Sequence, residues 1–147
     1  MTLLLKNKIF IYLIPLILGF VTSFSLPPYS YFFINFLTFP ILLIFLILNY
    51  KKGKWSSFKI GWMFGFGYFV SNLYWIPFSL SFDDNFKFLI PFALVIIPAF
   101  LSLFYAFALI TFKLFFNSKS IFVNILIFSL TLSFFEYLRG NILSGFP

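Results

Sequence analysis

The chain has 147 residues, of which 63% are hydrophobic and only 9% are charged. Soluble domains carry about 25% charged residues, so this composition excludes a soluble domain, a disordered tail and a basic nucleic-acid module. The length allows one domain with several membrane crossings, because each crossing takes about 20 residues. The absence of Cys and His excludes disulfides, thiolate nucleophiles, histidine bases and His/Cys metal sites from this sequence, and we expect no metal or cofactor.

Five apolar runs separated by short polar breaks predict an all-α integral membrane protein with about five transmembrane helices. A spanning segment must satisfy its own backbone, and none of the runs alternates as the strand of a membrane barrel does. The first run is marginal in length, and the others are close to the length that a spanning helix needs. The expected helices cover residues 9–24, 31–48, 60–82, 88–112 and 121–138.

The basic residues collect on one side of this predicted bundle. If the runs cross the membrane in turn, the opposite side has only Lys87 and Arg139. Basic residues are enriched on the cytoplasmic side, so we expect a cytoplasmic N-terminus and a periplasmic C-terminus. The residues on the cytoplasmic side are then Lys6, Lys8, Lys51, Lys52, Lys54, Lys59, Lys113 and Lys119.

A cleaved signal peptide is an alternative interpretation of the first run, with Lys6 and Lys8 as its basic region. No Ala-x-Ala-like site follows the run, and Pro27-Pro28 stands where a mature chain would begin, so a spanning helix is favoured.

Prolines interrupt four of the runs, which leaves two interpretations open. Irregular packing of bent helices is one, and a cavity between them is the other, since neighbouring groups can satisfy the carbonyls that a proline frees. The prolines are Pro15, Pro40, Pro77, Pro91 and Pro98.

The third run places small and polar residues on one stripe at helical spacing. Gly61 and Gly65 form a small-xxx-small pair, which lets another helix approach closely. Asn72 lies further along the stripe, where it either bonds a neighbouring helix or lines a lipid or substrate cavity. Trp75 ends the stripe and is either an interfacial anchor or part of the same cavity.

The fifth run ends with two charged residues three positions apart, Glu136 and Arg139, whose side chains can meet on one helix. Charges within a membrane segment are costly, and a functional role is the default hypothesis for them. The alternative is an interfacial ion pair that closes the helix.

Three stretches together resemble the N-terminal membrane region of the apolipoprotein N-acyltransferase family. Their order and spacing agree with that family over essentially the whole chain, and the last stretch is the most specific. They are Phe24-Ser25-Leu26-Pro27-Pro28-Tyr29, then Gly61-Trp62-Met63-Phe64-Gly65-Phe66-Gly67 with Asn72-Leu73-Tyr74-Trp75, and finally Glu136-Tyr137-Leu138-Arg139-Gly140-Asn141-Ile142-Leu143-Ser144-Gly145-Phe146-Pro147.

The resemblance implies a multi-pass enzyme of the bacterial cytoplasmic membrane. The family moves an acyl chain from a phospholipid onto an active-site Cys, and then onto the N-terminal S-diacylglyceryl-cysteine of a lipoprotein. The partners implied are therefore a phospholipid donor and a lipoprotein acceptor, with no nucleic acid. Its Glu-Lys-Cys triad belongs to a nitrilase-like periplasmic domain.

The sequence departs from the family because it has no Cys and stops before that domain would begin. We therefore expect an N-terminal region that has no catalytic residues and is inactive alone. The residues expected beneath the catalytic domain, as candidates for substrate or lipid binding, are Asn72, Trp75, Glu136 and Arg139. Two rival hypotheses are a small transporter or permease subunit, and a scaffold that binds membrane proteins through the Gly61/Gly65 face.

Overall fold

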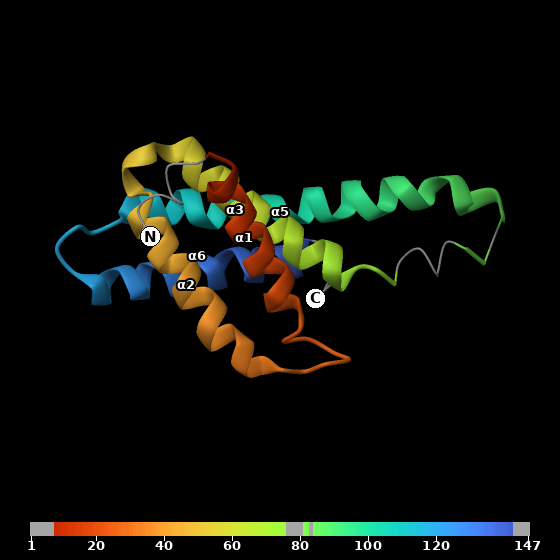
Figure 1. Cartoon of the computed structure of the whole chain (residues 1–147), viewed down its shortest axis with the longest axis horizontal. Coiled ribbons are helices and arrows are strands. Elements are labelled where there is room, and N and C mark those ends of the chain that lie inside the picture. The colour runs from red at the N-terminus through yellow and green to blue at the C-terminus, as the bar shows by residue number, and fades with distance from the viewer. Residues whose placement is uncertain (1–7, 76–80, 83, 143–147) are drawn as a thin grey trace.

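The structure, a computed structural model, describes residues 8–75, 81–82 and 84–142. Within these ranges it is all-α, as predicted, and has five α-helices (Figure 1). Short 3₁₀ turns join some of them, at Phe32–Ile34, Tyr50–Lys52 and Asp84–Leu89. The helices are α1 (Lys8–Ser23), α2 (Asn35–Leu48), α3 (Lys54–Asn72), α5 (Ile90–Phe115) and α6 (Ile121–Ile142).

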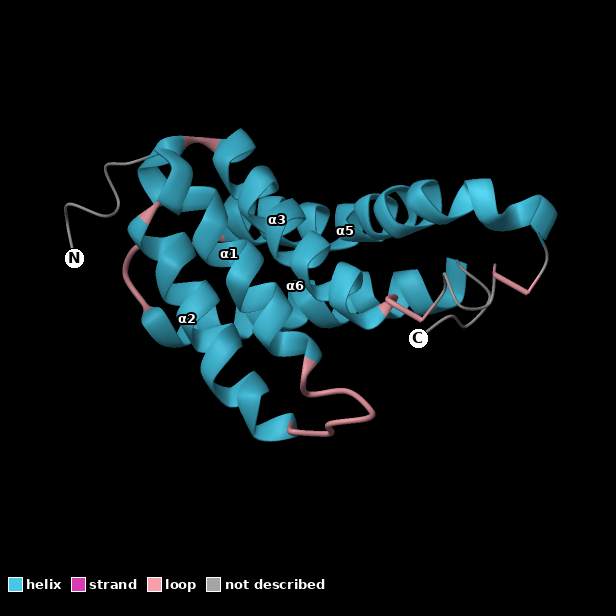
Figure 2. Cartoon of the chain, turned by 45° about the vertical axis from the view of Figure 1, so that its right-hand side comes forward, coloured by secondary structure: helices cyan, strands magenta, loops and turns pink. Residues whose placement is uncertain are grey.

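Helix α3 is the centre of the bundle, and it packs most extensively against α5 and α1. Helix α6 packs on α5, while α2 lies at the periphery beside α1 (Figures 1 and 2). The N-terminal part of α5 extends beyond the other helices in both views. The core is therefore built around α3, with buried side chains such as Phe64, Leu42 and Leu109.

Glycines on two faces of α3 allow this central position. A Cβ added to Gly61 would lie 2.5 Å from the backbone oxygen of Tyr105, and one added to Gly65 would lie 2.9 Å from the Cα of Ser102, both in α5. On the other face, a Cβ on Gly67 would collide with the backbone oxygen of Leu16 in α1. The backbone of α3 thus touches both neighbouring helices, which only glycine permits at these positions.

The observed helices differ from the predicted ranges most clearly at the third. It begins at Lys54 instead of residue 60, because Gly53 adopts a positive φ of 85° and lets the chain turn directly into the helix. It ends at Asn72 instead of residue 82, and residues 73–75 form a turn. Pro77, which the sequence placed within the third helix, lies outside the described residues.

The other differences are smaller. Pro15, Pro40 and Pro98 lie inside helices, whereas Pro91 occupies the first turn of α5, where a proline costs little. Helix α6 continues to Ile142 instead of ending at residue 138, so Glu136 and Arg139 lie within it.

Two of the described helical segments, Lys87–Phe115 and Ile121–Ile142, are long and apolar enough to cross a membrane. Ile9–Ser23 and Phe32–Leu48 are apolar but shorter. Helix α3 carries two lysines and several small polar residues among its apolar ones.

Candidate functional site

Glu136 and Arg139, on the last turns of α6, form the charged centre of the candidate site. The Arg139 Nη2 donates to Glu136 Oε2 over 2.6 Å, and Nε donates to the same oxygen over 3.1 Å. The Arg139 side chain is only 8% exposed, whereas that of Glu136 is 35% exposed. The guanidinium also lies over the ring of Phe69, 5.4 Å from its centroid. The cation therefore points into the bundle, and the carboxylate is its more accessible partner.

Two tyrosines from other helices surround this ion pair. The Tyr105 hydroxyl, from α5, interacts with the Glu136 carboxylate, and Tyr68, from α3, lies within the electrostatic reach of both charges. The two tyrosine rings contact each other edge to face, with centroids 5.8 Å apart, and Tyr105 also lies 5.9 Å from Phe69. Three helices thus bring polar and aromatic groups to one point. We call Tyr68, Phe69, Tyr105, Glu136 and Arg139 the polar cluster.

Asn72 extends the polar cluster along α3. It lies one turn after Tyr68 on the same face of the helix, close to the tyrosine hydroxyl. Its Nδ2 is buried and has no hydrogen-bond partner within the described ranges of the chain. A buried amide nitrogen without an acceptor is costly, so the position suits a polar group supplied by a ligand or by water.

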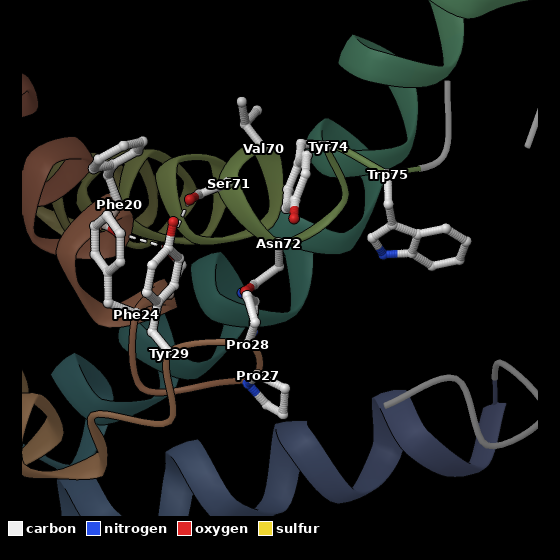
Figure 3. A pocket seen from close by; sticks show the side chains of 11 residues that line it. Phe20, Phe24, Pro27, Pro28, Tyr29, Val70, Ser71, Asn72, Tyr74 and Trp75 are labelled. Atoms are coloured by element: carbon white, nitrogen blue, oxygen red, sulfur yellow. Dashed lines mark hydrogen bonds between the residues drawn. The ribbon is translucent and has the colours of Figure 1, made fainter. Parts of the chain in front are cut away.

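A pocket of about 760 Å³ opens between the end of α1, the turn after it and the end of α3. Figure 3 shows Asn72 directed from α3 toward the turn at Pro27-Pro28, and Trp75 directed away from it. The wall between α1 and α3 is held by a hydrogen bond of 2.7 Å from the Ser23 hydroxyl to that of Ser71. The pocket has a mostly aromatic lining, and its residues with polar groups are Asn72, the two serines, Tyr29, Tyr74 and Trp75.

A second pocket, of about 620 Å³, lies between α2 and α6. We call it the α2–α6 groove. Its walls are apolar except for Ser129, Ser133 and Glu136, which follow one face of α6. Glu136 therefore belongs both to the polar cluster and to this groove. The other lining residues are Phe39, Pro40, Leu43, Ile44, Ile121, Ile125, Phe128 and Leu132.

The residues singled out in the sequence do not all meet. Glu136 bonds Arg139, and Asn72 joins them through Tyr68. Trp75 lies in the turn after α3 with 48% of its surface exposed, so the predicted helical stripe does not reach it, but it lines the same pocket as Asn72. Gly61 and Gly65 lie against α5, away from either pocket.

Tyr105 is the residue of the cluster that sequence reasoning missed. It lies inside a long apolar run with no motif around it, and only the close approach of α3 to α5 brings its ring to Tyr68 and Phe69. A buried tyrosine normally needs a hydrogen-bond partner, but the sequence does not show that this partner is a carboxylate on another helix.

The arrangement of the polar cluster beside the two pockets is suited to binding a ligand. The cluster has a carboxylate, a guanidinium and two phenols, and the whole sequence has no thiol or imidazole. An ion pair beside two largely apolar pockets fits an amphipathic ligand with a polar head and an apolar tail.

Comparison with known proteins identifies the family. A family model described as the apolipoprotein N-acyltransferase N-terminal domain matches residues 18–147. The chain belongs to the apolipoprotein N-acyltransferase family. The resemblance seen in the three sequence stretches is thereby confirmed.

Bacterial members of the family are similar to this chain over most of its length. Apolipoprotein N-acyltransferase of Rhodopseudomonas palustris is 38% identical over 139 residues, which cover 91% of this chain and 25% of that protein. Those of Brucella melitensis and Rhizobium rhizogenes are 37% and 33% identical and cover 88% and 92% of this chain, but 25% and 26% of their own lengths. The chain thus spans about a quarter of these relatives. No solved structure matches it.

Proposed function

We propose that this chain is the membrane region of an enzyme that transfers an acyl chain from a phospholipid to the N-terminal S-diacylglyceryl-cysteine of a lipoprotein. The observation that carries the proposal is the position of the Glu136–Arg139 pair. The pair belongs to the sequence stretch that is most specific to the family. Its polar cluster lines the α2–α6 groove through Glu136 and reaches the pocket between α1 and α3 through Asn72.

The surface supports a membrane location in the bacterial cytoplasmic membrane. Large apolar side chains are exposed on the outside of the bundle, among them Phe33, Phe36 and Leu130, each about 70% exposed. Exposed apolar surface of this extent is typical of contact with lipid. Together with the two helices long enough to span, it favours a multi-pass chain.

Within this proposal, Arg139 contacts a phospholipid phosphate and Glu136 orients the guanidinium. The geometry supports the orienting role, because Nε and Nη2 of Arg139 both donate to the same oxygen of Glu136, Oε2, and two bonds fix the plane of the guanidinium. Asn72 offers its buried amide nitrogen to a lipid or lipoprotein oxygen, and Trp75 anchors the end of the bundle at the membrane surface.

A chimera tests the proposed function. Residues 1–147 replace the matching N-terminal region of the Rhodopseudomonas palustris relative, and the chimera is expressed in bacteria depleted of their own enzyme. We expect N-acylated lipoprotein, measured by mass spectrometry of the lipoprotein N-terminus, because the membrane region supplies the binding surface for both substrates. The 147-residue chain alone should give none, since it has no Cys for the thioester. A chimera that inserts stably but forms no N-acylated product contradicts the proposal.

Reporter fusions test the proposed orientation. We expect a tag at residue 147 to be active only as a periplasmic reporter, and a tag in the loop at Gly53 only as a cytoplasmic one, because eight lysines mark the cytoplasmic side. A residue-147 tag that faces the cytosol excludes five spans with the N-terminus inside.

A further inference from the structure

The orientation of Arg139 is only as fixed as the carboxylate that it bonds. Both of its bonds to Glu136 end on one oxygen, Oε2, and the two residues share a single helix. Ion pairs between residues three apart on a helix are weak on their own, and Glu136 is 35% exposed, so water competes for its carboxylate. A fixed orientation of the pair therefore needs a further donor to Glu136 from outside α6.

Tyr105 of α5 supplies such a donor. Its hydroxyl interacts with the Glu136 carboxylate, and because an ionised carboxylate only accepts, the hydroxyl is the donor. Tyr105 is 5% exposed, and its ring contacts those of Phe64 and Tyr68, with centroids 5.2 and 5.8 Å away. A Cβ added to Gly65 would lie 3.1 Å from the Cδ2 of this ring, so the glycine leaves room for it. A side chain with only two torsions, confined by these contacts, holds its hydroxyl in one place.

The contact between α3 and α5 reaches both partners of the ion pair on α6. Phe69 of α3 lies 5.9 Å from Tyr105 between ring centroids, and the Arg139 guanidinium lies over the Phe69 ring. Tyr105 thus meets the carboxylate, and Phe69 meets the cation. The backbones of α3 and α5 are themselves in close contact at Gly61 and Gly65. The packed pair of α3 and α5 therefore sets where the charges of α6 point.

We propose that Tyr105 is a positioning residue of the candidate site, whose hydroxyl holds the Glu136 carboxylate, and through it the guanidinium plane of Arg139, for the acyl-transfer reaction. This inference rests on the proposed function, in which Glu136 orients Arg139, and it adds that another helix fixes that orientation. The alternative is that the carboxylate only satisfies a buried phenol. Arg139 would then be held equally well without the hydroxyl.

The sequence offers a direct test, because Arg139 is its only arginine and Glu136 its only glutamate. Arginine labelled with ¹⁵N in the full 147-residue chain, in detergent micelles, gives one guanidinium signal in NMR. We expect Tyr105→Phe to speed exchange of the Arg139 Nε proton with water about tenfold, which corresponds to about 1.4 kcal/mol, because a loosened carboxylate releases it more often. Tyr137→Phe removes the same atom at a position 68% exposed beside Glu136, and should leave the exchange unchanged.

A measurement on the unmodified chain keeps the result decisive if Tyr105→Phe does not fold. The γ-protons of Glu136 should show a nuclear Overhauser contact to a slowly exchanging tyrosine hydroxyl proton. This contact should persist in Tyr68→Phe, which removes the other hydroxyl of the polar cluster. Absence of the contact, or equal exchange of the Arg139 Nε proton in Tyr105→Phe and in the unmodified chain, overturns the inference.

Kinetics of the chimera extend the test to the reaction. We expect Tyr105→Phe to raise KM for phospholipid about tenfold and to change kcat by less than about twofold, because Arg139 meets the donor lipid before the chemical step. Tyr137→Phe should leave both constants unchanged. A hydroxyl with a purely structural role would lower the amount of folded chimera and leave KM as it was, and that result overturns the inference alone. An inactive unmodified chimera, with the Arg139 exchange as expected, contradicts the proposed function alone.

Discussion

Replacing Glu136 with leucine is expected to destabilise the chain by about 2–4 kcal/mol. The substitution removes the carboxylate from a guanidinium that is 8% exposed and lies over the ring of Phe69. Breaking a buried ion pair costs about 3–5 kcal/mol, and the lower range applies here because Glu136 itself is 35% exposed. The free energy of unfolding in detergent micelles, measured by denaturant titration, gives the result.

The double variant Glu136→Leu/Arg139→Leu separates a buried-charge effect from a general packing effect. We expect it to be more stable than Glu136→Leu, because no cation then lacks its carboxylate in the bundle. Tyr137→Leu, which changes a side chain 68% exposed on the same helix, is the control and should stay within about 0.5 kcal/mol of the unmodified chain. A double variant less stable than Glu136→Leu would show that the ion pair is not the cause.

Alanine at Gly67 and at Gly140 should change stability in opposite directions. At Gly67 the new Cβ collides with the backbone oxygen of Leu16, and Gly19 of α1 is in the same close contact with Phe64 of α3. The helices must separate, so we expect a loss of about 1–3 kcal/mol despite the better helix propensity of alanine. The measurement is the free energy of unfolding, with helicity followed by circular dichroism.

Gly140 is the matched control, since it also lies inside a helix but no described heavy atom is within 4 Å of its added Cβ. Gly140→Ala should stabilise α6 by up to about 1 kcal/mol through helix propensity alone. The close packing of α1 on α3 is refuted if both alanine variants stabilise the chain.

Contacts could be predicted from the sequence where the two residues are neighbours on one helix. Glu136 and Arg139 are three residues apart, and that spacing is enough to bring their side chains together on α6. The helical stripe was drawn too far at Trp75, because it assumed a helix that continues past Asn72, although Trp75 lines the same pocket as Asn72. The prediction also missed Gly67, although Ser71 follows it four residues later as a second small residue on the face of α3 that meets α1.

The sequence by itself determined the helical class, because apolar runs of this length can satisfy their backbone in hydrocarbon only as helices. It also determined the family, through stretches that are local in the chain. Only the tertiary structure decided that Tyr105 joins the ion pair and that Glu136 ends a groove between α2 and α6. Those contacts join residues of different helices, and they depend on how closely each pair of helices packs, which no pattern within one helix specifies.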